Sequence, residues 1–183
     1  MAIDDIFYIT GKGTIVTGKV DRGTLKSGDE VEIVGFSSEN KKVTVAGIEM
    51  FNETIESAEP GDVVGVILSN VGKDEIKVGQ VISKPDSIYS HTEFEAEIYV
   101  LSEEEGGINA PLVKGNNKKL YFRTTYVQGN IELLDEKESI MPGDNATINV
   151  KLTSPIAIEE GTEFAIFENN KIIGSGIVSE IMK

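Results

Sequence analysis

The sequence predicts an all-β chain that is divided into two halves of similar size. Three observations indicate this fold class. Apolar and polar residues alternate with a period of two over many short runs, turn-forming residues separate these runs, and no stretch shows a convincing helical period. Many short strands at such intervals are typical of β-barrels and β-sandwiches. The segment Lys84-Pro85-Asp86-Ser87 is the best candidate for a linker between the halves.

The expected strands differ in the pattern that predicts them. The earliest, residues 14–17, is β-branched throughout, and such side chains favour extended backbone. In the second half, Phe94, Ala96 and Ile98 alternate with glutamates, which predicts a strand with one buried face. In chain order, we expect strands at residues 14–17, 31–34, 43–45, 63–68, 94–100, 120–125 and 145–152.

Three of these strands follow the same short motif, in which Ser or Pro precedes Gly and Asp. The motif occurs as SGD at residues 27–29 and as PGD at residues 60–62 and 142–144. We expect its glycine to adopt a backbone angle that other residues avoid, so that the chain turns before the strand begins. The spacing of the motif is irregular, so it indicates reuse of one turn and not a solenoid repeat.

Another segment, GTIVTGKV at residues 13–20, differs by one residue from the phosphate-binding loop GxxxxGK[ST]. That loop needs a helix after it and a hydroxyl for the metal ion, but Val20 stands at the hydroxyl position. The β-branched residues 14–17 favour a strand, and the residues that follow favour turn and strand. The segment therefore predicts the first hairpin of a β-domain and gives no support to an NTPase.

Composition excludes several other kinds of site. The chain has 31 acidic and 17 basic residues, a net charge of −14 that opposes nucleic-acid binding except at local sites. It has no cysteine, which excludes disulfides and thiolate nucleophiles, and His91 is its single histidine, which excludes a multi-histidine metal site. Neither a long apolar run nor a basic leader is present. We expect a cytoplasmic protein with no catalytic residues, no cofactor, no metal and no membrane contact.

Longer segments of the chain resemble bacterial elongation factor Tu. They include IDDIFYITGKGTIVTGKVDRGTLKSGDEVEIVG, GDVVGVIL, VGQVISKP, HTEFEAEIYVLSEEEGG, YFRTT and IMPGDNATINVKLTSPIAIEEGTEFAIFE, in the family's order and spacing. The resemblance runs from about residue 3 to residue 183. It implies two antiparallel β-barrels in tandem, with the family's second domain at residues 1–86 and its third at 87–183. The family's GTPase domain is not covered, and we expect this chain to lack it.

The resemblance also implies a binding site in the first barrel, which in the family holds the aminoacylated 3′ end of tRNA. The terminal adenine lies there in a pocket of apolar side chains with one carboxylate, which suits a flat base with few polar partners. A cation and an amide that the family places in this pocket are replaced by Asn52 and Val63. The matching positions are Ile9, Ile15 and Ile67 for the apolar wall, Glu49 for the carboxylate, and Asp4, Asp5, Phe7 and Thr17 for the entrance of the aminoacyl group.

The second barrel departs further from the family, at positions where the resemblance implies contacts with the T stem of tRNA. Loss of phosphate contacts lowers affinity for nucleic acid and flattens its salt dependence. The positions are Ile108 and Asn109 in place of an Arg-His pair, Ser154 and Phe167 in place of basic residues, and Lys119 and Gln128 in place of polar contacts.

The sequence therefore favours a non-catalytic two-barrel module with weakened affinity for the 3′ end of aminoacyl-tRNA. The alternative is a protein-interaction module that docks on a GTPase domain or an exchange factor, because loss of the GTPase domain would expose an apolar docking surface. A fragment without tRNA binding is a further alternative.

Overall fold

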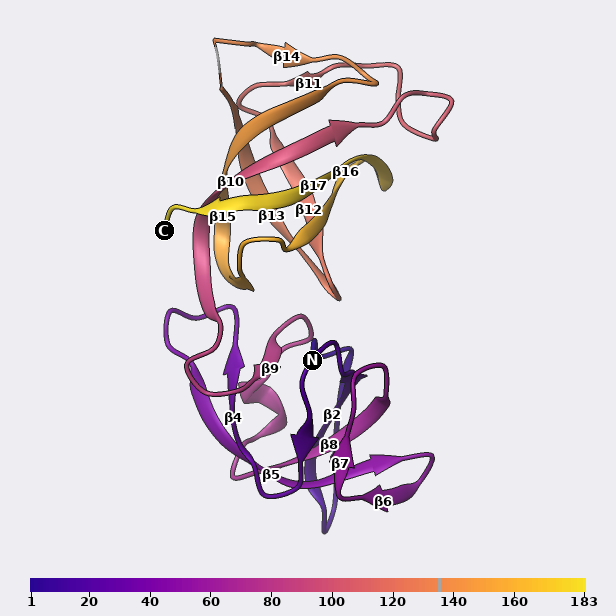
Figure 1. Ribbon diagram of the computed structural model, residues 1–183, viewed down its shortest axis with the longest axis vertical. Coiled ribbons are helices and arrows are strands. Elements are labelled where there is room, and N and C mark those ends of the chain that lie inside the picture. The colour runs from indigo at the N-terminus through magenta and orange to yellow at the C-terminus, as the bar shows by residue number, and fades with distance from the viewer. Residues whose placement is uncertain (135) are drawn as a thin grey trace. The chain divides into compact units, whose positions relative to one another are not determined.

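The computed structural model describes residues 1–134 and 136–183, which divide into two compact units, Met1–Ser90 and His91–Lys183 (Figure 1). Antiparallel strands form both units. Over the described residues, the 3₁₀ helix η1 (Lys73–Glu75) is the one helical element, and no helix is long and apolar enough to cross a membrane. The prediction of an all-β chain is therefore confirmed.

The first unit is an antiparallel sheet that curls until its two margins meet. Its neighbouring strands are β1 (Asp5–Ile9), β2 (Gly13–Lys19), β8 (Val63–Ser69), β5 (Lys41–Met50), β4 (Glu30–Val34) and β9 (Val81–Ser83), with β6 (Glu53–Ile55) beside β5 and β3 (Leu25–Lys26) paired with β7 (Ser57–Ala58). Residues 1–3 lead into β1 and bond to the opposite margin. The Ile82 N–H donates to the Met1 carbonyl at 2.8 Å, and the Ile3 N–H donates to the Gln80 carbonyl at 2.9 Å.

Alternate residues of these strands fill the interior of the first unit. Val16, Val45, Ile48 and Val66 come from β2, β5 and β8 and are fully buried. Because side chains point alternately to the two faces of a strand, the residues between them lie on the outer face. A bulge in β5, between Val45 and Gly47, adds one residue, which is why Val45 and Ile48 both face the core although they are three positions apart.

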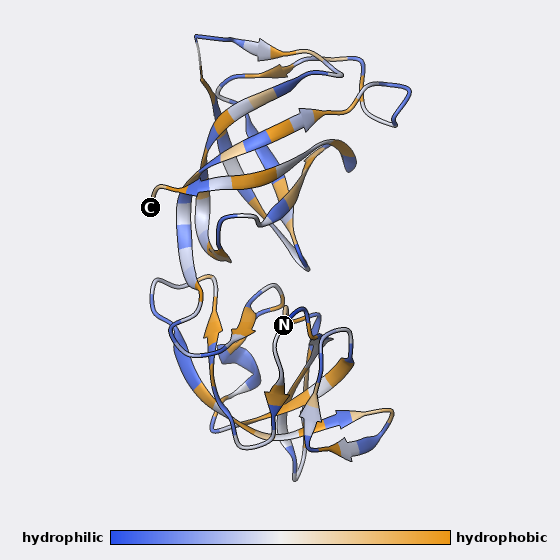
Figure 2. Ribbon diagram, viewed as in Figure 1, coloured by the Kyte–Doolittle hydropathy of each residue, from blue (hydrophilic) through white to orange (hydrophobic). Residues whose placement is uncertain are grey.

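The second unit contains a closed antiparallel barrel. Around the barrel run β10 (Tyr89–Val100), β15 (Asn145–Ile158), β13 (Thr125–Leu133), β12 (Asn117–Phe122), β16 (Glu163–Glu168) and β17 (Lys171–Ile181), while β11 (Leu112–Val113) pairs with β14 (Ser139–Ile140). Hydrophobic and hydrophilic residues alternate along its strands (Figure 2). Three buried rings meet in its core, with centroid distances of 6.1 Å between Phe94 and Phe122 and 5.2 Å between Phe122 and Phe164.

The predicted Gly-Asp turns are confirmed. Gly28, Gly61 and Gly143 have φ of 91°, 96° and 90°, in the region that favours glycine. The turns also dock on neighbouring strands. At Gly61, the glycine N–H donates to the Val20 carbonyl at 2.8 Å, and the Val20 N–H donates back to the Asp62 carbonyl at 2.9 Å. The turn therefore both reverses the chain and fixes the strand that follows it.

The same turn, with a glycine at positive φ that donates to a neighbouring segment, occurs at two places where the sequence did not predict it. Gly79 and Gly161 have φ of 97° and 88°, and their N–H groups also donate to carbonyls of neighbouring segments. The next residue is Gln80 or Thr162 in place of Asp. The side chains of both accept the backbone N–H three residues earlier, at 2.7 and 3.1 Å. An acceptor side chain therefore serves in these turns where the motif has Asp.

One expected strand is wrong. Residues 120–125 alternate in polarity, but β12 ends at Phe122 and the chain reverses, so that Phe122 lies opposite Thr125 in β13. Arg123, at the reversal, has φ of 51°. Its guanidinium donates to the Ala157 carbonyl at 2.6 Å, a long-range contact that holds the turn. The alternation of residue types continues across the turn, so the pattern alone could not reveal it.

Candidate functional site

Four neighbouring strands of the first unit, β1, β2, β8 and β5, bring most of the sequence-predicted site residues onto one outer face. Phe7 lies opposite Ile15, and Ile15 lies opposite Ile67. Ile67 in turn lies opposite Gly47. Ile15 is buried, whereas Phe7 is 45% exposed at the margin. These residues form an apolar row across the sheet.

A polar row lies directly beside the apolar row. Asp5 lies opposite Thr17, and Thr17 lies opposite Gly65. Gly65 in turn lies opposite Glu49. Corresponding members of the two rows are two residues apart on each strand, so their side chains point to the same face. The polar row therefore has a carboxylate at each end, Asp5 on β1 and Glu49 on β5.

Two glycines leave the middle of this face without side chains of its own. A Cβ at Gly65 would lie 3.4 Å from Cγ2 of Ile15, and a Cβ at Gly47 would lie 3.4 Å from Cδ1 of Ile67. Because these side chains are absent, the two glycines do not cover the isoleucines, of which Ile15 is 5% exposed and Ile67 is half-buried. The face therefore offers an apolar floor between its two carboxylates.

The carboxylate of Glu49 has a partner. The ammonium of Lys12, in the loop between β1 and β2, forms an ion pair with its Oε1. The side chains of Glu49 and Lys12 are 24% and 48% exposed, so the ion pair is open to solvent. At the other end of the polar row, Asp5 Oδ1 accepts the Ile6 N–H at 2.8 Å. Each carboxylate therefore has a second oxygen that a ligand can reach.

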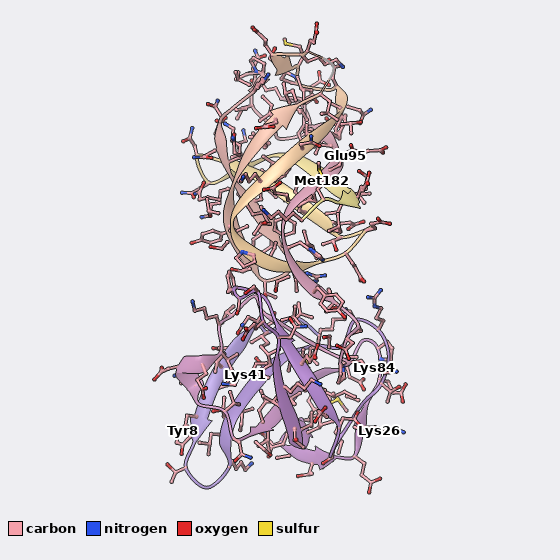
Figure 3. All side chains as sticks on the ribbon, turned by 90° about the vertical axis from the view of Figure 1, so that its left-hand side faces the viewer. Tyr8, Lys26, Lys41, Lys84, Glu95 and Met182 are labelled. Carbon is pink, nitrogen blue, oxygen red and sulfur yellow. The ribbon has the colours of Figure 1, made fainter. Side chains whose placement is uncertain are left out.

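Three sequence-predicted residues lie at the margin of the face or outside its strands. Ile9 lies opposite Gly13 at the end of β1 and is 44% exposed. Asp4 precedes β1 and is exposed. Val63 lies opposite Lys19, one step beyond the polar row, and is 63% exposed. Tyr8, on the same strand as Ile9, is also exposed at the outside of the unit (Figure 3).

The hairpin between β5 and β6 carries Asn52 and a residue that the sequence analysis missed. Phe51 and Asn52 form its two-residue turn, with φ of 52° and 64°. Phe51 is 89% exposed and lies two residues beyond Glu49. A bulky residue is unusual at such an angle, and glycine, asparagine or aspartate is usual in such a turn. The hairpin itself was not predicted, so no signal in the sequence singles out Phe51.

Family models of known proteins match both units. The model of elongation factor Tu domain 2 matches residues 13–83, and the model of the elongation factor Tu C-terminal domain matches residues 87–182. The chain belongs to the elongation factor Tu family. The resemblance seen in the sequence is thereby confirmed. Both matched models describe non-catalytic domains of elongation factor Tu, and neither describes its GTPase domain.

In the elongation factor Tu C-terminal domain of this chain, three of the six expected T-stem positions are neighbours on the barrel. Lys119 lies opposite Phe167 on one side and Gln128 on the other. The rings of Phe167 and Tyr121 meet edge to face, with centroids 6.1 Å apart, and the Lys119 ammonium lies 3.4 Å from the centre of the Tyr126 ring. The other positions lie elsewhere on the chain: Ser154 in β15, and Ile108 and Asn109 between β10 and β11.

The outer face of β1, β2, β8 and β5 is the candidate binding face of this chain. Among the residues that the structure describes, no group of three or more His, Cys, Asp or Glu is placed to hold a metal ion. Residues 13–19 form β2, and the next regular element is β3, so no helix follows as a phosphate-binding loop requires. His91 belongs to β10, outside the strands of the face. The arrangement suits binding of a flat apolar group beside carboxylates.

Proposed function

We propose that the first unit binds the aminoacylated 3′ end of tRNA on the face formed by β1, β2, β8 and β5. The observation that carries this proposal is the adjacency of two rows. An apolar row centred on Ile15 and Ile67 lies beside a polar row that ends in Asp5 and Glu49. Membership of the elongation factor Tu family supports the same ligand.

The apolar row suits the terminal adenine. A purine buries its flat face against hydrocarbon and needs few polar partners. Phe7 and Ile67 supply most of the exposed hydrocarbon, Ile15 lies buried between them, and the absent side chains of Gly47 and Gly65 leave room above the row. Contacts of this kind contribute about 1–3 kcal/mol per base.

Glu49 suits the ribose beside that base, because a carboxylate accepts hydrogen bonds from sugar hydroxyls. Lys12 holds one oxygen of this carboxylate, so a hydroxyl binds at the other oxygen or displaces the lysine. A displaced ammonium can pair with a phosphate of the terminal nucleotides. We therefore propose that Lys12 exchanges Glu49 for a phosphate when the tRNA end binds.

Asp5 suits the aminoacyl group. The ester leaves a free α-ammonium, which a carboxylate attracts. Asp5 lies three strand spacings from Glu49, about 14 Å along the polar row, on the far side of Thr17 and Gly65. This separation places the group that recognises the amino acid away from the group that recognises the ribose.

The proposed affinity is weakened for two reasons. Asn52 and Val63 supply neither the cation nor the amide implied by the resemblance, and each hydrogen bond lost costs about 0.5–1.5 kcal/mol. The net charge of −14 also repels the phosphate backbone. We propose a cytoplasmic module that acts on aminoacyl-tRNA by binding alone, without catalysis.

Titration of the protein with fluorescently labelled aminoacyl-tRNA at low salt tests this function. We expect saturable binding, and we expect Glu49→Ala to weaken it about tenfold through the loss of one charge-assisted hydrogen bond. Glu39→Ala makes the same change of charge at an exposed position in the loop between β4 and β5 and should leave binding unchanged. Absence of saturation, or equal affinities of the Glu49→Ala and unchanged proteins, would contradict the proposal.

A further inference from the structure

The second unit carries an exposed apolar surface that the proposed function does not use. It lies on the outer faces of β12, β13, β16 and β17 and consists of Tyr121, Tyr126, Phe167, Ile172 and Ile177, which we call the aromatic face. Its two tyrosines are 39% and 55% exposed, and its two isoleucines are 44% and 49% exposed. Exposed apolar surfaces of this kind mark sites of interaction.

Strand pairing makes the aromatic face continuous. Tyr121 lies opposite Tyr126, and Phe167 lies opposite Ile172. The ring contact between Tyr121 and Phe167 joins these two pairs. Ile177 lies farther along β17, on the other side of the small pair Ala165 and Ser175. Residues from strands that are far apart in the chain therefore form one surface.

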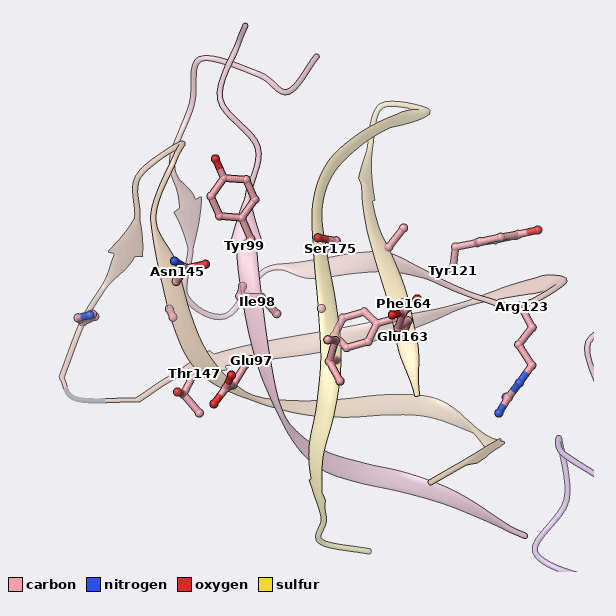
Figure 4. A pocket seen from close by; sticks show the side chains of 15 residues that line it. Glu97, Ile98, Tyr99, Tyr121, Arg123, Asn145, Thr147, Glu163, Phe164 and Ser175 are labelled. Carbon is pink, nitrogen blue, oxygen red and sulfur yellow. The ribbon is translucent and has the colours of Figure 1, made fainter. Parts of the chain in front are cut away.

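A hollow of about 920 Å³ adjoins this face (Figure 4). Its lining includes two small residues, Ala165 and Ser175, which lie opposite each other. Tyr121 flanks this pair on one side and Tyr99 on the other. The Tyr99 hydroxyl donates to Glu105 at 2.6 Å, which holds its ring in place. Aromatic side chains that are already held in place lose little conformational freedom when a partner binds.

Two carboxylates border Ile177 within the same hollow. Glu97 and Glu163 lie opposite Ile177 on its two neighbouring strands. Neither glutamate has an ion-pair partner among the described residues. Arg123 and Lys137 also line the hollow, but the two glutamates are the residues directly opposite Ile177, so the surface around Ile177 attracts a cation.

The charge of Lys119 does not change the preference of the surface around Ile177 for a cation. Lys119 lies opposite Phe167, but its ammonium stands 3.4 Å from the centre of the Tyr126 ring. The protein's own aromatic ring therefore already contacts this cation, and a phosphate that binds Lys119 must compete with that contact. A surface with exposed rings, one cation in contact with a ring and two carboxylates without an ion-pair partner in the described part of the chain suits a protein better than a nucleic acid.

We propose that the aromatic face and its hollow bind a protein partner whose contact segment carries apolar side chains beside a lysine or arginine. The apolar side chains cover Tyr121 and Ile177, and the cation enters the hollow beside Glu97 and Glu163, within reach of a tyrosine ring. Phe167 stands where the resemblance implies a basic contact with tRNA. This proposal does not depend on tRNA binding by the first unit.

Titration of ¹⁵N-labelled protein with two defined peptides, followed by amide chemical shifts, tests the proposal. One probe is a hexapeptide of alternating leucine and lysine, and its counterpart alternates leucine and glutamate. We expect saturable binding of the leucine–lysine peptide, with shifts in β10, β12, β16 and β17, and no shifts with the counterpart. Ile177→Ser should raise the Kd about tenfold. Val113→Ser, at an apolar position of 42% exposure in β11, should leave it unchanged.

Exchange of charge provides the decisive comparison. Glu97→Lys combined with Glu163→Lys should make the protein prefer the leucine–glutamate peptide. Glu103→Lys combined with Glu104→Lys changes the net charge equally in an exposed loop and should keep the original preference. Equal effects of the two double variants, or no saturable binding of either peptide, would overturn the proposal. Shifts of the same amides by a double-stranded RNA oligonucleotide would do so too. The amide spectrum shows directly whether each variant is folded.

Discussion

Gly65 allows the proposed binding of the tRNA end to be tested separately from folding. Its φ lies outside the region that favours glycine, so a side chain introduces no backbone strain. A Cβ at this position would lie 3.4 Å from Cγ2 of Ile15 and 4.0 Å from the Glu49 carbonyl oxygen, which are ordinary contacts. Gly65→Ala should therefore fold. The reduced freedom of its unfolded chain should raise the free energy of unfolding by about 0.4–1 kcal/mol.

The same methyl group stands on the floor where the adenine is proposed to lie. It separates the ring from Ile15 and Ile67, and dispersion attraction falls steeply when a gap opens between surfaces. If the contacts of one base, about 1–3 kcal/mol, are lost, the Kd rises about 5- to 150-fold. Gly65→Val should obstruct the floor further while keeping a residue that favours strands.

Two measurements together decide the outcome: titration with labelled aminoacyl-tRNA gives the Kd, and urea unfolding gives the stability. Gly72→Ala is the matched control, because Gly72 has φ of −80° and its Cβ would meet only the carboxylate of Glu75, at 3.2 Å. We expect Gly72→Ala to bind like the unchanged protein. Tight binding by folded Gly65→Ala and Gly65→Val proteins would refute the placement of the adenine on this floor.

Other parts of the molecule give three more predictions. Lys12→Ala should reduce the steepness of log K against log salt by about 0.7, where K is the association constant for aminoacyl-tRNA, because one phosphate contact to a single strand contributes about that much. Titrations at several salt concentrations measure this slope, and an unchanged slope would exclude the contact. Gly61→Ala should lower the free energy of unfolding in urea by about 1–2 kcal/mol, because φ at Gly61 is 96°, whereas Gly72→Ala should show no such loss. Burial lowers the pKa of His91 below its ordinary value of 6.5. The unfolded chain therefore binds a proton at His91 that the folded chain does not, so the contribution of His91 to stability is constant above pH 6.5 and falls as the pH decreases through 6.5. His91→Gln should flatten this decrease, and an NMR midpoint of 6.5 or higher for the single imidazole would contradict the reasoning.

Local sequence patterns predict much of the fold, and the family resemblance implies three of the four residues in each site row. Alternation places Ile15 and Thr17 on the same face of one strand, whatever lies beside that strand. The Gly-Asp motif predicts its turns because only glycine adopts the required angle without strain. Sequence reasoning failed where the signal was not local. The reversal at Arg123 depends on a carbonyl of β15, and Phe51 becomes notable only once it stands at a hairpin tip.

The sequence by itself determined the all-β class, the Gly-Asp turns, the membership of the elongation factor Tu family and the alternation that gives each strand an inner and an outer face. Only the tertiary structure decided which outer residues become neighbours. It placed Glu49 beside Gly65 and within reach of Lys12, and it joined Tyr121 to Phe167 in the aromatic face. The physical reason is that backbone preference and polarity act over a few residues, whereas strand register is fixed by burial and pairing across the whole sheet.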